Sequence, residues 1–210
     1  MQHVIEQCEK NVKEIYESFD ASHDWQHIER VRQNAKLLLE KEDADGFLIE
    51  LAVLLHDVSD PKYKKAGEEL ETEILQELDL SDEQRTAVKA IIDSVSFKGG
   101  NGAPAESAEA KIVQDADRLD ALGAVGIART FAFGGAKGRK LYDWQEEPRG
   151  KMTEEEYRSK PTSSATHFYE KLLLLKERMN TETGKHIAEE RHQFMISFLE
   201  QLKKETDGNQ

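Results

Sequence analysis

The segment 51–57 constrains the fold more than any other part of the sequence. Apolar side chains recur here at the i, i+3, i+4 and i+7 spacing of one helix face: Leu48, Leu51, Ala52 and Leu55. Pro61 cannot continue the helix because it lacks an amide N–H. The adjacent pair His56 and Asp57 therefore lies at the inner end of a core helix. Both are metal-ligand types, but neighbours on an ideal helix point about 100° apart. They can share one cation only near the helix end, with further ligands from other segments.

Composition limits the class of protein. The chain of 210 residues, 38% hydrophobic and 34% charged, can bury a core as one domain or as a domain with a small appendage. Its formal net charge of −13 argues against binding nucleic acid polymers or anionic membranes, which require Lys and Arg. A small anionic substrate would need a local basic site or a bound cation. The single Cys8 excludes an internal disulfide framework, and the lack of an N-terminal apolar segment predicts a cytoplasmic protein.

Apolar periodicity predicts an all-α chain. The expected helices cover residues 2–18, 24–41, 47–57, 65–78, 82–95, 107–121, an apolar segment reaching Phe133, 164–179 and 184–203. Ser81 and Gln84 have the spacing of a capping box. We expect a single domain over 1–204 and a flexible tail at 205–210. Residues 134–163, rich in Gly and Pro, are expected to form a long excursion, either a lid, a binding loop or a disordered segment.

Two further segments offer metal ligands. His27 lies on the apolar stripe of its helix, where a lone His is more often structural, but the presence of His56 and Asp57 favours a ligand. Asp117 shares a helix face with apolar residues and Asp120, and a buried carboxylate is costly unless it is paired or metal-bound. Taken alone, Asp117 also fits a solvated acidic face. Asp115 and Asp120 are candidates for supporting or ion-pairing roles.

Together these residues resemble the HD-domain superfamily of metal-dependent phosphohydrolases. The ordered motif is His27-x-x-Arg30-Val31, then His56-Asp57, then Ala116-Asp117, within about residues 20–125. The segments 22–27, 115–123 and 178–184 add a resemblance to the bacterial YpgQ-like and YedJ-like single-domain group. The resemblance implies an HD-domain helical bundle in which His27, His56, Asp57 and Asp117 hold one divalent cation. His56 and Asp57 are then the catalytic pair, through a metal-activated water, with no separate general base identified.

The ligand types limit the metal. Mixed imidazole and carboxylate ligands suit Mn, Fe, Co, Ni or Zn better than an all-oxygen calcium site. We favour Mn²⁺, with Mg²⁺ as a further alternative.

An anionic substrate requires local cations in this acidic chain. Basic side chains near the motif or on the last helices are the candidate substrate contacts: His23, Arg30, Lys64, Arg118, His167, Lys171, Arg178 and Arg191. Arg191 lies on an otherwise apolar helix side, so it pairs either with a phosphate or with a carboxylate of this protein. A solvated cluster is the alternative for Lys64.

Two other motifs are weaker. The segment 23–27 resembles the H-E-x-x-H zinc-protease motif, but Asp24 is one carbon shorter than the Glu that activates water. The glycine-rich segment 133–140 lacks the P-loop spacing and a preceding strand. It favours a flexible lid that carries Lys137, Arg139 and Lys140.

The resemblance implies hydrolysis of a nucleoside triphosphate or deoxynucleoside triphosphate to monophosphate and pyrophosphate. A nucleoside 5′-monophosphate phosphatase is the alternative enzyme. A non-catalytic metal-binding helical regulatory module is the alternative outside enzymes. The sequence contains no H-H-E-x-x-D-G-x-G-Y-P segment, which argues against cyclic dinucleotide phosphodiesterases. It does not specify the oligomeric state.

Overall fold

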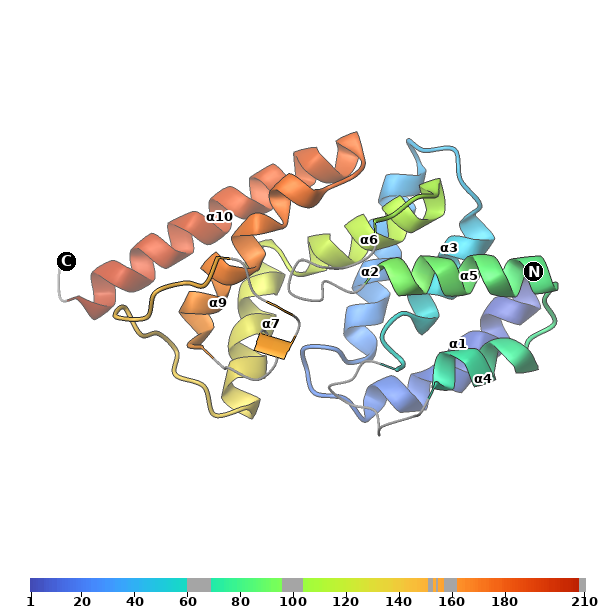
Figure 1. Ribbon diagram of the computed structural model, residues 1–210, viewed down its shortest axis with the longest axis horizontal. Helices are drawn as coiled ribbons and strands as arrows, with labels where there is room; N and C mark the ends of the chain where they lie inside the picture. The colour runs from blue at the N-terminus through green and yellow to red at the C-terminus, as the bar shows by residue number, and fades with distance from the viewer. Residues whose placement is uncertain (60–68, 96–103, 151–152, 154, 157–161, 208–210) are drawn as a thin grey trace. The chain divides into compact units, whose positions relative to one another are not determined.

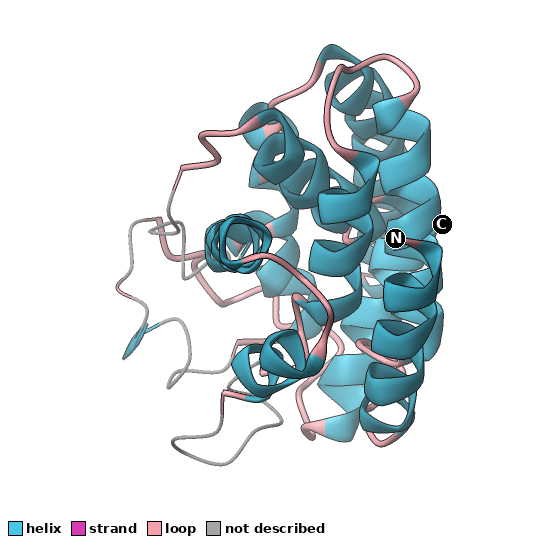
Figure 2. Ribbon diagram, turned by 90° about the vertical axis from the view of Figure 1, so that its right-hand side faces the viewer, coloured by secondary structure: helices cyan, strands magenta, loops and turns pink. Residues whose placement is uncertain are grey.

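The computed structural model describes residues 1–59, 69–95, 104–150, 153, 155–156 and 162–207. Within these ranges the chain forms α-helices, short 3-10 turns and loops, and no strand (Figures 1 and 2). The predicted all-α fold class is confirmed. The described residues up to Asp117 form one compact unit, and those from Arg118 onward form a second.

The first unit is built around a central helix. Its helices are α1 (Gln2–Glu17), α2 (Trp25–Leu39), α3 (Gly46–Leu55), α4 (Leu70–Glu77), α5 (Asp82–Val95) and most of α6 (Ala108–Asp120). Helix α3 packs against α1, α2 and α5. Ile49 and the run Leu51–Leu55 are buried, so α3 is apolar on nearly every side, as a helix inside a core must be.

Side-chain caps fix where these helices begin. The Asp24 carboxylate accepts a hydrogen bond from the His27 amide at the start of α2, and Asp45 accepts from the Phe47 amide at the start of α3. The predicted capping box is confirmed before α5. The Ser81 amide donates to Gln84 Oε1 at 2.9 Å, and the Gln84 amide donates to Ser81 Oγ at 3.2 Å.

The second unit contains the C-terminal helices. They are α7 (Gly123–Ala136), α9 (Ser164–Glu170), the 3-10 turns η2 (Leu172–Leu174) and η3 (Lys176–Arg178), and α10 (Glu182–Thr206). Helix α7 packs against both α9 and α10. Three aromatic rings, one from each of these helices, pack together with centroids 5.7–6.2 Å apart: the buried Phe168 and the half-buried Phe131 and Phe198.

The expected continuous helix over 164–179 is wrong. Helix α9 ends at Glu170, and Lys171 leaves helical geometry with φ −137°. The 3-10 turns that follow have three residues per turn, so Leu172 and Leu175 lie on one face, and both are buried. The i, i+3 spacing of Leu172 and Leu175 also fits one face of an α-helix. Apolar periodicity in the sequence therefore does not distinguish an α-helix from 3-10 turns here.

The irregular excursion expected over residues 134–163 begins later in the structure. Residues 134–136 belong to α7, so the irregular segment begins at Lys137. The amides of Ser164 and Ala165 then donate to the carbonyls of Lys140 and Leu141, each at 2.9 Å. Backbone hydrogen bonds thus join the first part of the excursion to the start of α9. At the other end of the unit, α10 runs to Thr206, so the first two residues of the expected tail are helical.

The basic side chains proposed for a flexible lid make local contacts. Lys137 Nζ and the Arg139 guanidinium lie 5.6 and 5.3 Å from the centroid of the Phe133 ring. Lys140 Nζ lies 2.7 Å from the Asp143 carboxylate. The three basic side chains thus contact residues close to them in the chain, Phe133 of α7 and Asp143 of the excursion.

Candidate metal centre

Side chains from three helices of the first unit converge on one point. Helix α2 supplies His27, the end of α3 supplies His56 and Asp57, and α6 supplies Asp117. Nε2 of His27 lies 3.4 Å from Oδ2 of Asp57 and 3.6 Å from Oδ1 of Asp117. Nε2 of His56 lies 3.6 and 3.8 Å from the same two oxygens. Residues 90 positions apart in the chain thus form one cluster, as the sequence motif predicts.

The two imidazoles are buried, whereas the carboxylates reach the surface. Both histidine side chains have 0% exposure, and the Asp57 and Asp117 side chains have 17% and 29%. Nδ1 of His56 lies 2.8 Å from the Val53 carbonyl oxygen. Since a carbonyl only accepts, Nδ1 carries the proton, and in the neutral ring Nε2 presents a lone pair to the cluster.

The electrostatics of the cluster favour an ionised carboxylate. Burial alone would raise the pKa of Asp57, but the neighbouring imidazoles of His56 and His27, in their protonated form, outweigh it. They hold the pKa of Asp57 well below its usual range. Asp57 is therefore anionic at neutral pH.

The donor set fits a divalent transition metal. His27, His56 and Asp57 each offer a ligand atom within 4.8 Å of the others. The N–O separations of 3.4–3.8 Å exceed the usual N–H···O hydrogen-bond range of about 2.7–3.2 Å. Imidazole nitrogens beside carboxylates are the ligand combination that Mn, Fe, Co, Ni and Zn share.

Among the candidate substrate contacts of the first unit, His23 lies beside the cluster. The His23 ring lies 5.8 Å, centroid to centroid, from the His27 ring, and its Nδ1 is 2.6 Å from Ser22 Oγ. His23 precedes the start of α2 at Trp25, and Asp24 caps that helix. The H-E-x-x-H arrangement, which needs both histidines on one helix, is therefore absent from this segment. Arg30 is half-buried on α2, and Lys64 lies outside the described residues.

The other five candidates belong to the second unit. Nη1 of Arg118 donates to the Arg178 carbonyl, which brings two of them together. Nη1 of Arg191 donates to the Leu119 carbonyl at 2.6 Å. Burial lowers the pKa of Arg191, while nearby Asp120 raises it. His167 lies on α9, and Lys171 follows that helix directly.

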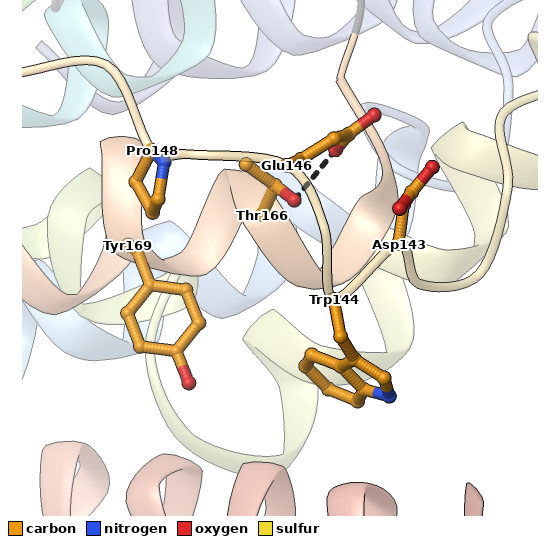
Figure 3. A pocket seen from close by; sticks show the side chains of 6 residues that line it. All are labelled: Asp143, Trp144, Glu146, Pro148, Thr166 and Tyr169. Carbon is orange, nitrogen blue, oxygen red and sulfur yellow. Dashed lines mark hydrogen bonds between the residues drawn. The ribbon is translucent and has the colours of Figure 1, made fainter.

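A hollow in the second unit has the wrong charge for a polyphosphate. It encloses about 200 Å³, and Figure 3 shows its described lining: Asp143, Trp144, Glu146, Pro148, Thr166 and Tyr169. Two of these six residues are acidic, and none is Lys or Arg. Oε2 of Glu146 already accepts from the Thr166 hydroxyl at 2.6 Å and the Ser163 amide at 2.9 Å.

Two residues that contact the backbone beside the cluster, Tyr16 and Asn34, were not predicted from the sequence. The Tyr16 hydroxyl lies beside the backbone of Leu54 and Asp57. Nδ2 of Asn34 donates to the Ala116 carbonyl at 3.0 Å and so joins α2 to α6 next to Asp117. Neither contact has a local sequence signal, because each partner lies on another helix. Of the acidic neighbours that were noticed, Asp115 is fully buried, and Asp120 pairs with Arg129 at 2.8 Å.

Known proteins match the chain in sequence and in fold. The family model for the HD domain matches residues 24–122. YpgQ of Bacillus subtilis (strain 168) is 40% identical over 208 residues, which cover 97% of this chain and 94% of YpgQ. Its crystal structure in complex with ADP has a TM-score of 0.74 at 37% identity and covers 98% of this chain and 100% of that chain.

Two further crystal structures are similar over nearly their whole length. A protein of Lactobacillus plantarum is 34% identical with a TM-score of 0.89, and 99% of each chain is covered. An HD-superfamily hydrolase of Bacillus thuringiensis is 45% identical with a TM-score of 0.72, and 98% of each chain is covered.

The helical fold and the cluster of His and Asp side chains thus define an HD-superfamily hydrolase. The chain belongs to the HD-domain family and is a homologue of YpgQ. Among its described helices, none combines the length and apolar character needed to cross a bilayer.

Proposed function

We propose that this hydrolase cleaves nucleoside or deoxynucleoside triphosphates to the monophosphate and pyrophosphate with one divalent cation, preferably Mn²⁺. The observation that carries the proposal is the cluster of His27, His56 and Asp57. A nucleotide substrate is supported by the relative YpgQ, which was crystallised with ADP.

We assign the metal ligands as Nε2 of His27, Nε2 of His56, and the carboxylates of Asp57 and Asp117. A divalent cation bound by these four residues would withdraw charge from a phosphoryl oxygen and lower the pKa of a bound water. The His56–Val53 contact keeps a nitrogen lone pair directed into the site, and ionised Asp57 supplies negative charge. The 17% and 29% exposures of the two carboxylates, against 0% for the imidazoles, place the accessible side of the cluster at Asp57 and Asp117.

The chemical step is a hydrolysis. The water oxygen forms a bond to the α-phosphorus, the bond from that phosphorus to the α,β-bridging oxygen breaks, and pyrophosphate leaves with the bridging oxygen and its electron pair. The proton that the water loses goes to solvent. We assign His23 a contact with the phosphate chain, because its ring lies 5.8 Å from the ring of the proposed ligand His27. The other basic candidates, including those of the second unit, stay predictions.

A product assay tests the proposal. Metal-stripped protein is resupplied with Mn²⁺, Mg²⁺, Co²⁺, Ni²⁺ or Zn²⁺ and given a panel of nucleoside mono- and triphosphates. We expect equal amounts of pyrophosphate and monophosphate from triphosphates, with the highest rate in Mn²⁺. In ¹⁸O-labelled water the label should enter the monophosphate, because the attack is on the α-phosphorus.

Other products would contradict the proposal in distinct ways. Orthophosphate from monophosphates, without pyrophosphate from triphosphates, would identify a nucleotidase instead. Label found only in pyrophosphate would place the attack on the β-phosphorus. No product from any pair of metal and nucleotide would remove nucleotides as the substrate class.

A further inference from the structure

The Tyr16 hydroxyl bridges two backbone groups at the end of α3. Its oxygen lies 3.0 Å from the Leu54 carbonyl oxygen and 3.3 Å from the Asp57 amide nitrogen. A carbonyl only accepts and an amide N–H only donates, so the phenol donates to Leu54 and accepts from Asp57. The two contacts lie on either side of His56.

Packing fixes the ring that carries this hydroxyl. Tyr16 is fully buried at the C-terminal end of α1. Its ring meets Phe19 edge to face at 5.5 Å and lies tilted against Trp25 at 6.3 Å. A phenol held in this way directs its hydroxyl to one place.

The backbone that Tyr16 contacts carries two adjacent side chains, His56 and Asp57, that converge on one point. Neighbouring side chains on an ideal helix diverge by about 100°. Yet Nε2 of His56 lies only 3.6 Å from Oδ2 of Asp57, where α3 ends at Leu55 and His56 is its C-cap with φ −63° and ψ −29°. The direction of Asp57 therefore depends on the turn between these residues.

Two carbonyls near the end of α3 bind side chains. A helix leaves its last four carbonyls without intrahelical donors. The Val53 carbonyl accepts from His56 Nδ1, and the Leu54 carbonyl accepts from Tyr16. The same turn thus receives one contact from a candidate ligand and one from α1.

We propose that Tyr16 is a positioning residue for the metal centre, because its hydroxyl fixes the turn that presents His56 and Asp57 to one cation. This inference rests on the proposed ligands and therefore on the proposed function.

The test compares Tyr16→Phe, which removes only the hydroxyl, with Val12→Ala. Val12 is fully buried one turn earlier on α1, so its truncation weakens packing but leaves the hydroxyl in place. Mn²⁺ affinity is measured by electron paramagnetic resonance of free Mn²⁺ in titrations of metal-stripped protein, and Tm by circular dichroism. Supporting residues around metal ligands typically change affinity by about 10–100-fold, so we expect Tyr16→Phe to raise the Mn²⁺ Kd about tenfold. We expect Val12→Ala to lower Tm with the Mn²⁺ Kd unchanged.

The kinetic signature should also separate the two variants. At saturating Mn²⁺ we expect Tyr16→Phe to lower kcat while the KM for nucleotide stays near the wild-type value. Tyr16→Met, which also lacks the hydroxyl, serves as a second variant if Tyr16→Phe fails to fold, and it should bind Mn²⁺ equally weakly. A wild-type Mn²⁺ Kd in a folded variant without the hydroxyl would overturn the inference. So would a weakening in Val12→Ala as large as that in Tyr16→Phe.

The test also separates this inference from the proposed reaction. A wild-type protein that binds Mn²⁺ but releases no pyrophosphate would overturn the proposed reaction alone. The comparison of Mn²⁺ Kd values between the variants would then still decide the role of Tyr16.

Discussion

Nδ1 of His56 lies 2.8 Å from the carbonyl oxygen of Val53, three residues earlier in the chain. This contact assigns the ring proton to Nδ1 and turns the Nε2 lone pair toward Asp57 and Asp117. The helix that forms the core of the first unit thereby also sets the chemical state of a candidate ligand.

Replacing either residue of the His-Asp pair should abolish activity without unfolding the protein. A catalytic metal supplies several kcal/mol of transition-state stabilisation, and about 1.4 kcal/mol corresponds to tenfold in rate. We therefore expect His56→Ala and Asp57→Ala to lower the Mn²⁺-dependent kcat/KM by about a hundredfold or more. Circular dichroism at 222 nm should be unchanged, because both residues follow the last helical residue of α3.

The matched control for these variants is His186→Ala. His186 lies on α10 with a side chain that is 80% exposed, so its loss should leave kcat/KM unaltered. If His56→Ala and Asp57→Ala both retained activity, the ligand assignment would be wrong.

A buried ion pair should stabilise the second unit. Nε and Nη2 of Arg149 contact the two oxygens of Glu170 at 2.7 and 2.9 Å, and the Glu170 side chain is only 1% exposed. Removing one partner of a buried pair costs about 3–5 kcal/mol, and Arg149 is 24% exposed. We therefore expect Glu170→Ala to lower the free energy of unfolding by about 2–3 kcal/mol, measured by urea denaturation at pH 7.

The Arg149–Glu170 ion pair should make the free energy of unfolding depend on pH. Burial raises the pKa of Glu170, but the hydrogen bonds from Arg149 and Thr162 outweigh it, so the folded pKa lies below the ordinary 4.5. A depressed folded pKa stabilises the protein above the unfolded value, and this contribution is lost as pH falls through the folded value. The stability difference between wild type and Glu170→Gln should therefore be largest near neutral pH and shrink below about pH 4.5. A difference that stayed constant down to pH 3 would contradict the ionised pair.

Cys8 should be chemically inert in the folded protein. It is fully buried, and burial, together with Glu9 and Glu50, raises the pKa of its thiol to about 12 despite nearby Arg32. Because the thiolate is the reactive form, Ellman's reagent at pH 8 should label no thiol in native protein and one per chain in denaturant. Rapid labelling of native protein would show that the packing of α1 opens readily.

The sequence predicted the features that depend on local patterns. Helices α2 and α5 follow from apolar periodicity, and the Ser81 capping box has a fixed spacing. The clustering of His27, His56, Asp57 and Asp117 was expected because their order in the chain resembles the HD-domain motif, which implies that the four residues hold one cation. Such signals depend on neighbours in the sequence or on a recognisable residue order.

Long-range contacts between ordinary residues carry no such signal. Tyr16 lies on the buried side of an amphipathic helix, where any aromatic residue would serve for packing, and its contact with Asp57 spans 41 residues. Arg149 and Glu170 are two among many charged residues, and only the folded excursion brings them together. Such pairs follow from the tertiary arrangement rather than from periodicity.

Two glycines of α7 should respond oppositely to the same substitution. A Cβ on Gly126 would lie 2.1 Å from the Ala121 carbonyl oxygen, a backbone atom that cannot rotate away. Overpacking of this kind costs about 1–3 kcal/mol, so Gly126→Ala should lower the free energy of unfolding by at least that amount. A Cβ on Gly135 would meet nothing within 4 Å.

Gly135→Ala is thus the matched control within the same helix. Alanine in a helix is favoured over glycine by about 0.5–1 kcal/mol, mainly because glycine loses more backbone entropy on folding. We expect Gly135→Ala to raise the urea midpoint and Gly126→Ala to lower it, with equal m-values. Equal effects in the two variants would mean that helix propensity alone governs α7. Opposite effects would show that α7 needs glycine at 126 because its first turn lies directly against the Ala121 carbonyl.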